Sequence, residues 1–198
     1  MEVVEMVLVG KVNKSLVSLI NIVGTTAMGL CGMDARLLTA RPAPDAVALG
    51  FVGEVACMDP TILWPILADG HMPHIPVIAS VAVDGGGQGY NMNADTAVGE
   101  IAAAMGAEKL ILLTDMVGIL EDRNDPGSLV KEIDIGGVRR MVEKGKVAGR
   151  MIPKVNCCIR SLAQGFRTAS IIDGCIPDSL LLEILTDEGV GTMIPLSF

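Results

Sequence analysis

Residues 95–120 read DTAVGEIAAAMGAEKLILLTDMVGIL, and their pattern indicates the fold class. Its first part predicts a helix over Asp95–Met105 that ends at Gly106, since glycine commonly follows a helix end. Its second part, Leu110–Thr114, is a short apolar run that predicts a buried strand. A helix followed at once by such a strand is typical of α/β proteins.

The same alternation continues along the rest of the chain. Further helices are predicted at 13–23, 59–68, 135–144, 153–164 and 177–185, and further strands at 27–31, 51–58, 76–81, 168–172 and 190–196. Asp59 is expected to cap its helix and Gly70 to end it. The polar segment Asp122–Ser128 is expected to be a surface loop. The pattern predicts one α/β domain with a largely parallel sheet.

Composition narrows the class of protein. The chain has 198 residues, of which 51% are hydrophobic and 19% charged, enough for one sizeable core. No apolar run approaches the roughly 20 residues that span a bilayer, so no membrane segment is expected. The net charge of −8 and the aromatic content of 3% argue against nucleic acid as a partner. The acidic residues Glu2 and Glu5 are not typical of a signal or transit peptide.

Cysteine and histidine usage argues against several kinds of site. The five cysteines show no CxxC spacing and predict reduced thiols, with Cys157 and Cys158 as packing residues of a helix. Only His71 and His74 are present, both in a proline-rich turn. A histidine-based metal site or a Ser-His-Asp triad is therefore not expected.

Three motifs could carry chemistry. Residues 90–96 (YNMNADT) stand at a loop-to-helix junction, where Asn91 and Asn93 offer amide groups and Asp95 favours a helix start. The same residues would also suit an Asx turn with a helix cap.

The second motif is MIPK at 151–154, in which Pro153 suits a first helical turn. Lys154 would then lie at the positive end of a helix, which makes sense if both face a bound phosphate. A solvated surface lysine is the alternative.

The third motif is the strand end at Thr114 and Asp115. Ligands of open α/β sheets bind beyond the carboxyl ends of strands, although an ordinary turn would look the same. The glycines at 85–87 are weak evidence for phosphate binding, and we interpret them as a flexible hairpin tip.

Taken in order, eight motifs resemble the amino-acid kinase family, and within it the acetylglutamate kinases of plants and cyanobacteria. The motifs are 7–14 (VLVGKVNK), 34–42 (DARLLTARP), 49–55 (LGFVGEV), 90–95 (YNMNAD), 110–120 (LILLTDMVGIL), 151–155 (MIPKV), 169–174 (ASIIDG) and 187–194 (DEGVGTMI). The resemblance implies a three-layer α-β-α sandwich with a mostly parallel central sheet in a single domain, 1–198. Its substrate side would be about 1–90 and its nucleotide side about 91–198.

The resemblance also implies a reaction, in which ATP phosphorylates the side-chain carboxylate of N-acetyl-L-glutamate for arginine biosynthesis. Mg²⁺ would arrive with the nucleotide. By this resemblance Asn91 holds the substrate, Lys154 stabilises the transferred phosphoryl group, and Asp95 orients lysines. The residues expected to border the nucleotide are Thr114, Asp115, Gly118 and Leu120. A homo-oligomer, the signal protein PII as a partner and a location in the chloroplast stroma, or otherwise the cytoplasm, are implied in the same way.

The sequence departs from the family pattern in several places. Family members carry a second phosphate-binding lysine, two glycine-rich turns and a substrate-binding arginine ahead of the segment that matches Met1. We therefore expect the first strands to be missing and the activity to be reduced. Inside the chain, Arg150 stands where the family usually has glycine, Cys175 where it has arginine and Asp178 where it has histidine.

Two other functions remain open at this point. A nucleotide-binding or interaction protein derived from such a kinase would keep the nucleotide half without turnover. The residues of the YNMNAD and MIPKV motifs argue against a different carboxylate kinase, one for aspartate or for glutamate.

Overall fold

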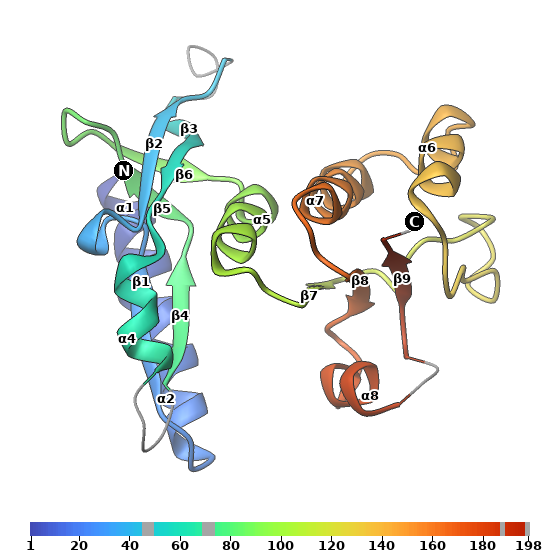
Figure 1. Ribbon diagram of the computed structural model, residues 1–198, viewed down its shortest axis with the longest axis horizontal. Coiled ribbons are helices and arrows are strands. Elements are labelled where there is room, and N and C mark those ends of the chain that lie inside the picture. The colour runs from blue at the N-terminus through green and yellow to red at the C-terminus, as the bar shows by residue number, and fades with distance from the viewer. Residues whose placement is uncertain (45–49, 69–73, 187–188, 197–198) are drawn as a thin grey trace. The chain divides into compact units, whose positions relative to one another are not determined.

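The computed structural model describes residues 1–44, 50–68, 74–186 and 189–196. They form two compact units, Met1–Ala104 and Met105–Phe198 (Figure 1). Helices and strands alternate in both units, so the predicted α/β class is confirmed. Gly70, His71 and the motif residues Leu49 and Asp187 lie outside the described residues.

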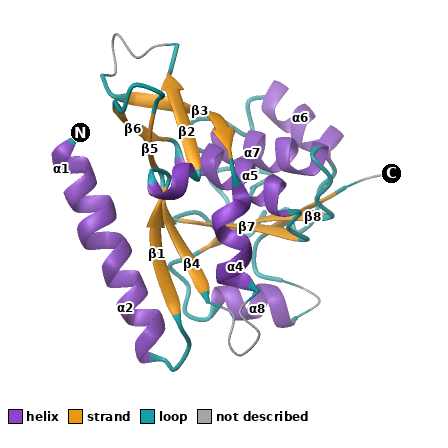
Figure 2. Cartoon of the chain, turned by 60° about the vertical axis from the view of Figure 1, so that its left-hand side comes forward, coloured by secondary structure: helices purple, strands orange, loops and turns teal. Residues whose placement is uncertain are grey.

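The first unit begins with a long helical segment that lies along two parallel strands. α1 (Glu2–Glu5), the π-helical η1 (Met6–Asn13) and α2 (Lys14–Ile22) follow one another without a gap. Figure 2 shows this segment beside β1 (Ala27–Cys31) and β4 (Ile75–Ala79), which pair in parallel.

This helical segment is longer than the sequence predicted, since only 13–23 was expected to be helical. Residues 2–12 contain five valines and Gly10, which are poor helix formers. Packing against a sheet overrides such weak propensities. The helix therefore depends on tertiary contacts for its first half.

Asn13 links this helix to both strands. Its side chain is 2% exposed, and its Nδ2 donates to the carbonyl oxygens of Leu30 at 3.1 Å and Val77 at 2.7 Å. Lys14 Nζ donates to the Gly29 carbonyl at 3.0 Å. A side chain at position 29 would collide with Asn13 Oδ1, so glycine permits this close approach.

Four short strands close a small barrel in the order β2-β3-β6-β5. They are β2 (Leu38–Pro42), β3 (Val52–Met58), β6 (Gly89–Met92) and β5 (Val81–Val83). The sequence did not predict β2 or β6. The single strand expected at 76–81 is wrong, because Ser80 separates β4 from β5 and the two belong to different sheets.

The helix predicted after Asp59 starts as a 3-10 turn, η3 (Pro60–Ile62), and continues as α4 (Leu63–Leu67). Asp59 caps it as predicted, since its carboxylate accepts a hydrogen bond from Thr61 N at 3.0 Å. After the barrel comes α5 (Ala94–Met105), one residue longer than predicted.

The second unit is built on three strands. β7 (Lys109–Thr114) pairs in parallel with β8 (Thr168–Asp173), and β9 (Thr192–Pro195) adds an antiparallel edge strand as expected. The helices of this unit are α6 (Ile135–Glu143), α7 (Met151–Ala163) and α8 (Ser179–Leu185). Cys157 and Cys158 are buried in α7, which agrees with their predicted packing role.

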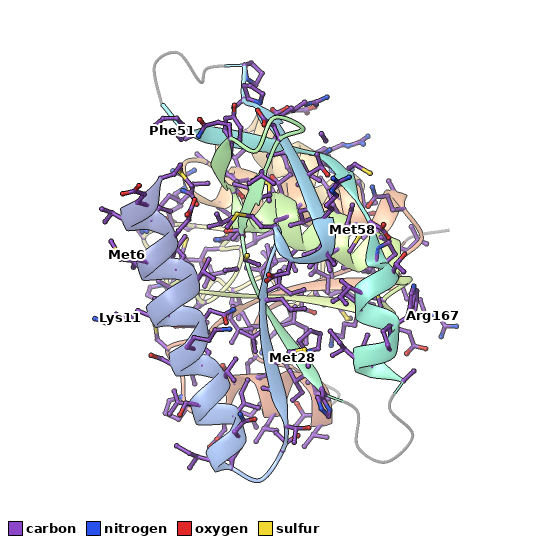
Figure 3. All side chains as sticks on the ribbon, turned by 90° about the vertical axis from the view of Figure 1, so that its left-hand side faces the viewer. Met6, Lys11, Met28, Phe51, Met58 and Arg167 are labelled. Carbon is purple, nitrogen blue, oxygen red and sulfur yellow. The ribbon has the colours of Figure 1, made fainter. Side chains whose placement is uncertain are left out.

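The outer face of the first helical segment carries exposed apolar side chains, among them Val3, Met6, Leu19 and Ile22. Met6 and Lys11 point away from the strands (Figure 3). Within the described ranges, none of the helices combines the length and the apolar character needed to cross a membrane.

Candidate active-site residues

The carboxyl end of β7 carries a polar turn. The Thr114 hydroxyl accepts a hydrogen bond from Met116 N and donates to Met116 O, both at 2.9 Å. Thr114 lies opposite Asp173, the last residue of β8, and its carbonyl accepts from Gly174 N at 2.8 Å. The ends of two parallel strands therefore stand together, which is where α/β sheets bind ligands.

The start of α7 reaches this strand end. Arg150 is the N-cap residue of α7, and its Nη1 lies 3.1 Å from Asp115 Oδ2. The helix begins at Met151, two residues earlier than predicted, so Lys154 is its fourth residue. Arg150 and Lys154 are four residues apart and so share one face of the helix start.

Pro153 fits this earlier start. It is the third residue of α7, where a backbone N–H would have no partner within the helix. The structure thus brings Thr114 and Asp115 to the end of the second unit at which α7, the helix that carries Lys154, begins. Arg150 was not predicted to belong to this group, because its partner Asp115 lies 35 positions earlier in the chain.

Gly118 and Leu120 follow in the same loop. Gly118 has a φ of 136°, and a Cβ there would lie 2.6 Å from Thr192 Oγ1. Ile119 N donates to that same hydroxyl at 2.8 Å, and Leu120 bridges to Leu129. Gly118 therefore has a clear packing role, and a role beside a nucleotide stays a prediction for both residues.

In the first unit, Asn91 lies within the barrel strand β6. Its backbone N donates to Phe51 O at 2.9 Å, and it pairs with Val52 of β3 and Val81 of β5. Strands on both sides thus hold the Asn91 backbone. The side chain itself is half-buried.

Asn93 is the residue of the YNMNAD motif that caps the helix. Its Oδ1 accepts from Thr96 N at 3.2 Å. Asp95 is the second residue of α5 and is half-buried. Its carboxylate lies in the first helical turn, where the helix dipole favours a negative charge.

The glycine-rich turn is a hairpin tip, as interpreted from the sequence, and joins β5 to β6. The Asp84 carboxylate accepts from Gly86 N at 2.8 Å and Gln88 N at 3.0 Å. The hydrogen bonds from the amides of Gln88 and Gly86 lower the pKa of Asp84. These amides are therefore used inside the turn and do not form a phosphate loop.

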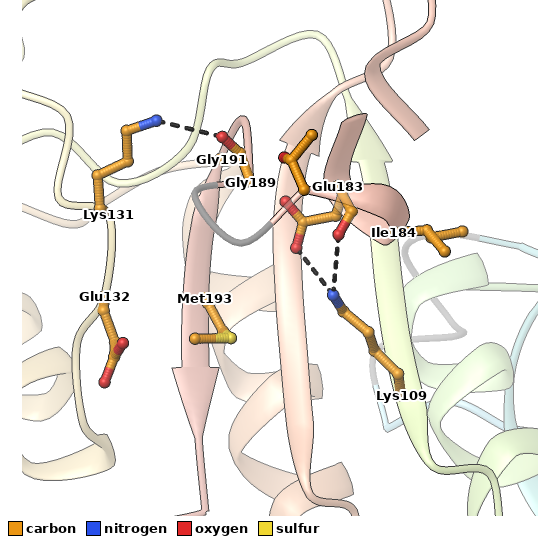
Figure 4. A pocket seen from close by; sticks show the side chains of 9 residues that line it. Lys109, Lys131, Glu132, Glu183, Ile184, Gly189, Gly191 and Met193 are labelled. Carbon is orange, nitrogen blue, oxygen red and sulfur yellow. Dashed lines mark hydrogen bonds and ion pairs between the residues drawn. The ribbon is translucent and has the colours of Figure 1, made fainter. Parts of the chain in front are cut away.

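A pocket of roughly 660 Å³ lies at the other end of β7 (Figure 4). Lys109, the first residue of β7, forms an ion pair with Glu183 in its wall, with 3.1 Å between Nζ and Oε1. Burial raises the pKa of Glu183, but hydrogen bonds and the charge of Lys109 outweigh it, and the pKa is lowered. None of the predicted site residues is among the described residues that line this pocket.

The five cysteines all lie in the described part of the chain, and none of them forms a disulfide. Asp173 raises the pKa of the exposed Cys175 thiol, mainly through its charge. No group of three or more His, Cys, Asp or Glu side chains among the described residues is arranged to hold a metal ion.

Solved structures share this fold. A Streptococcus mutans protein matches with a TM-score of 0.81 at 24% identity, over 100% of this chain and 72% of its own. Carbamate kinase from Giardia lamblia bound to AMP-PNP matches with a TM-score of 0.64 at 15% identity, over 93% of this chain and 67% of its own. At these identities the similarity concerns the fold alone.

Sequence relatives are much more similar. The chloroplastic acetylglutamate kinase of Arabidopsis thaliana is 69% identical over 98% of this chain, and that of a Nostoc species is 60% identical over the same share. The chain spans 55% and 64% of the length of these two relatives. The model of the amino acid kinase family matches residues 1–173. The chain therefore belongs to the amino acid kinase family.

Proposed function

We propose that this chain serves the ATP-dependent phosphorylation of the side-chain carboxylate of N-acetyl-L-glutamate, a step of arginine biosynthesis. The relatives at 60% and 69% identity are named acetylglutamate kinases, which supports the proposal. In this reaction a carboxylate oxygen attacks the γ-phosphorus of ATP, and the bond from that phosphorus to the β,γ-bridging oxygen breaks. The products are an acyl phosphate and ADP.

The observation that carries the proposal is the cationic start of α7 beside the end of β7, where Arg150 is bonded to Asp115. Phosphoryl transfer needs little covalent help from a protein and depends on positioning and on neutralising negative charge. Lys154, in the first turn of α7, is the residue we assign to the moving phosphoryl group. Four residues of the same unit are assigned to the nucleotide: Thr114, Asp115, Gly118 and Leu120.

The residues of the first unit are assigned to the acceptor. Asn91 carries an amide that can donate to the acetyl or carboxylate oxygens of acetylglutamate and accept from its amide N–H. Asp95 is assigned a positioning role toward lysines. Mg²⁺ enters as part of the nucleotide substrate and adds positive charge at the phosphates.

The experiment is a coupled assay of ADP release by this chain with N-acetyl-L-glutamate, and with aspartate and glutamate as competing acceptors. We expect release with acetylglutamate, and Lys154→Met to lower it by about 10²–10³-fold. Lys144→Met changes the same residue type at the exposed end of α6 and should leave the rate unchanged.

Other outcomes select other functions. ATP binding without ADP release would favour the nucleotide-binding or interaction protein. Release with aspartate or glutamate in place of acetylglutamate would favour a different carboxylate kinase.

We also propose a chloroplast location, supported by the chloroplastic relative from Arabidopsis thaliana. A homo-oligomeric state and PII as a partner are proposed from the family resemblance alone. Light scattering on the purified chain, with and without PII, tests the two assemblies. Fluorescence of a tagged gene product in plant cells tests the location.

A further inference from the structure

We propose that Arg150 is a nucleotide-binding residue that shields Asp115 and offers its guanidinium to the phosphates. This inference rests on the proposed role of the β7–α7 end in binding ATP. The family usually has glycine at this position, so the proposed role of Arg150 is specific to this chain.

The backbone accepts an arginine at this position without strain. Arg150 has φ −65° and ψ −15°, ordinary helical values that any residue adopts. The left-handed conformation needed at the turn is taken by Gly149, with a φ of 59°. An arginine therefore fits at this position without backbone strain, and its side chain reaches Asp115.

Electrostatics at the strand ends explains what this cation does. Asp115 follows Thr114, and Asp173 lies opposite Thr114 across the parallel pair. With Lys154 alone, the formal charges of this group sum to −2 + 1 = −1, which would repel a triphosphate. Arg150 brings the sum to 0 and adds a second cation on the face of α7 that carries Lys154.

The ion pair leaves the Arg150 guanidinium accessible to a phosphate while it stays beside Asp115. The side chains of Arg150 and Asp115 are 80% and 56% exposed, and exposed ion pairs contribute little to stability. The planar guanidinium matches phosphate oxygens in a bidentate way, with stronger hydrogen bonds than neutral groups make. Shielding Asp115 and contacting phosphate both act in the same direction, since both strengthen binding of a polyphosphate.

The test is calorimetric titration of the chain with MgATP and with adenosine, for the wild type, Arg150→Gly and Arg150→Lys. We expect Arg150→Gly to weaken MgATP binding about tenfold, as one lost charge-assisted contact would. Adenosine binding should change less than about twofold, because adenosine has no phosphate. Arg150→Lys should retain part of the affinity, because lysine keeps the positive charge but lacks the paired N–H donors of the guanidinium.

Arg167→Gly is the matched control. Arg167 is an exposed arginine of the same unit (Figure 3) and directly precedes β8, at the opposite end of that strand from Asp173. It should bind MgATP like the wild type. High salt should reduce the difference between Arg150→Gly and the wild type, because screening weakens exposed charges.

Three results would overturn the inference. If the wild type binds MgATP and Arg150→Gly binds it equally well, the inference fails and the proposed function stands. If Arg150→Gly weakens adenosine and MgATP by the same factor, Arg150 acts on the fold only. If the wild type binds no MgATP at all, this inference and the assignment of the nucleotide site fail together.

Discussion

At the scale of single residues, Asn13 shows how one polar side chain can align a helix with a sheet. Its Nδ2 supplies hydrogen bonds to carbonyl oxygens of β1 and β4, and it does so from a position only 2% exposed. Buried acceptors that lose their donor cannot turn to water, so the full cost of their desolvation is felt.

We predict that Asn13→Ala lowers the free energy of unfolding by about 2–3 kcal/mol, measured by urea denaturation. Asn21→Ala is the control on the same helix, because Asn21 Oδ1 accepts from Ala27 N at an exposed site. It should cost about 1 kcal/mol or less. Equal losses in the two variants would contradict the role assigned to Asn13.

Residues of the candidate site differ in how far the sequence could predict them. Thr114, Asp115 and Lys154 were identified because each follows from a local pattern, a strand end or a helix start. Arg150 was noticed only as a departure from the family, since nothing in the sequence relates it to Asp115. The cap that the YNMNAD motif could form is present at Asn93, which accepts a hydrogen bond from Thr96 N, while the roles of Asn91 and Asp95 in the same motif stay predictions.

At the scale of elements, the loop from β7 to the Leu120 bridge is held against β9 by a glycine. The Gly118 backbone is left-handed, and a Cβ there would meet Thr192 Oγ1 at 2.6 Å and Leu129 Cδ1 at 2.8 Å. Any side chain must therefore push the loop away from the β9 edge strand.

We predict that Gly118→Ala lowers the melting temperature clearly, with a loss of about 2–4 kcal/mol from strain and displaced packing together. Gly106→Ala is the matched control, since Gly106 also has a positive φ, 62°, but open space around it. Its cost should be about 1 kcal/mol. A Gly118→Ala variant as stable as Gly106→Ala would show that the loop yields easily.

Elements with a strong local signal were predicted almost to the residue, such as β1, β7, β8 and α6. Elements that depend on contacts with distant parts of the chain were not predicted. β6 contains Gly89 and Asn91, which are poor strand formers, and it exists because β3 and β5 flank it. The valine-rich start of the first helix is likewise helical because two strands lie beneath it.

At the scale of the whole molecule, acidic residues outnumber basic ones by 23 to 15. Several carboxylates have a lowered pKa in the folded state, among them Asp59, through hydrogen bonds from Thr61, and the buried Glu183. Such groups bind protons more tightly when the chain unfolds, so acid favours unfolding. Among these carboxylates, Glu183 should contribute most to the pH dependence of stability, because its side chain is only 5% exposed.

The sign of the effect follows from the direction of the shift. Because the folded pKa of Glu183 lies below the unfolded value of about 4.3, its contribution is complete above that value and is lost as the pH falls through the folded pKa. We predict that Glu183→Gln costs about 2–4 kcal/mol at pH 7, because Lys109 loses its partner in a largely buried pair. The difference from the wild type should shrink in urea titrations at pH 3. Glu54→Gln, which breaks the exposed pair with Arg41, should cost less than about 1 kcal/mol at either pH. A Glu183→Gln deficit that is the same at pH 7 and pH 3 would mean that packing, and not charge, gives Glu183 its role.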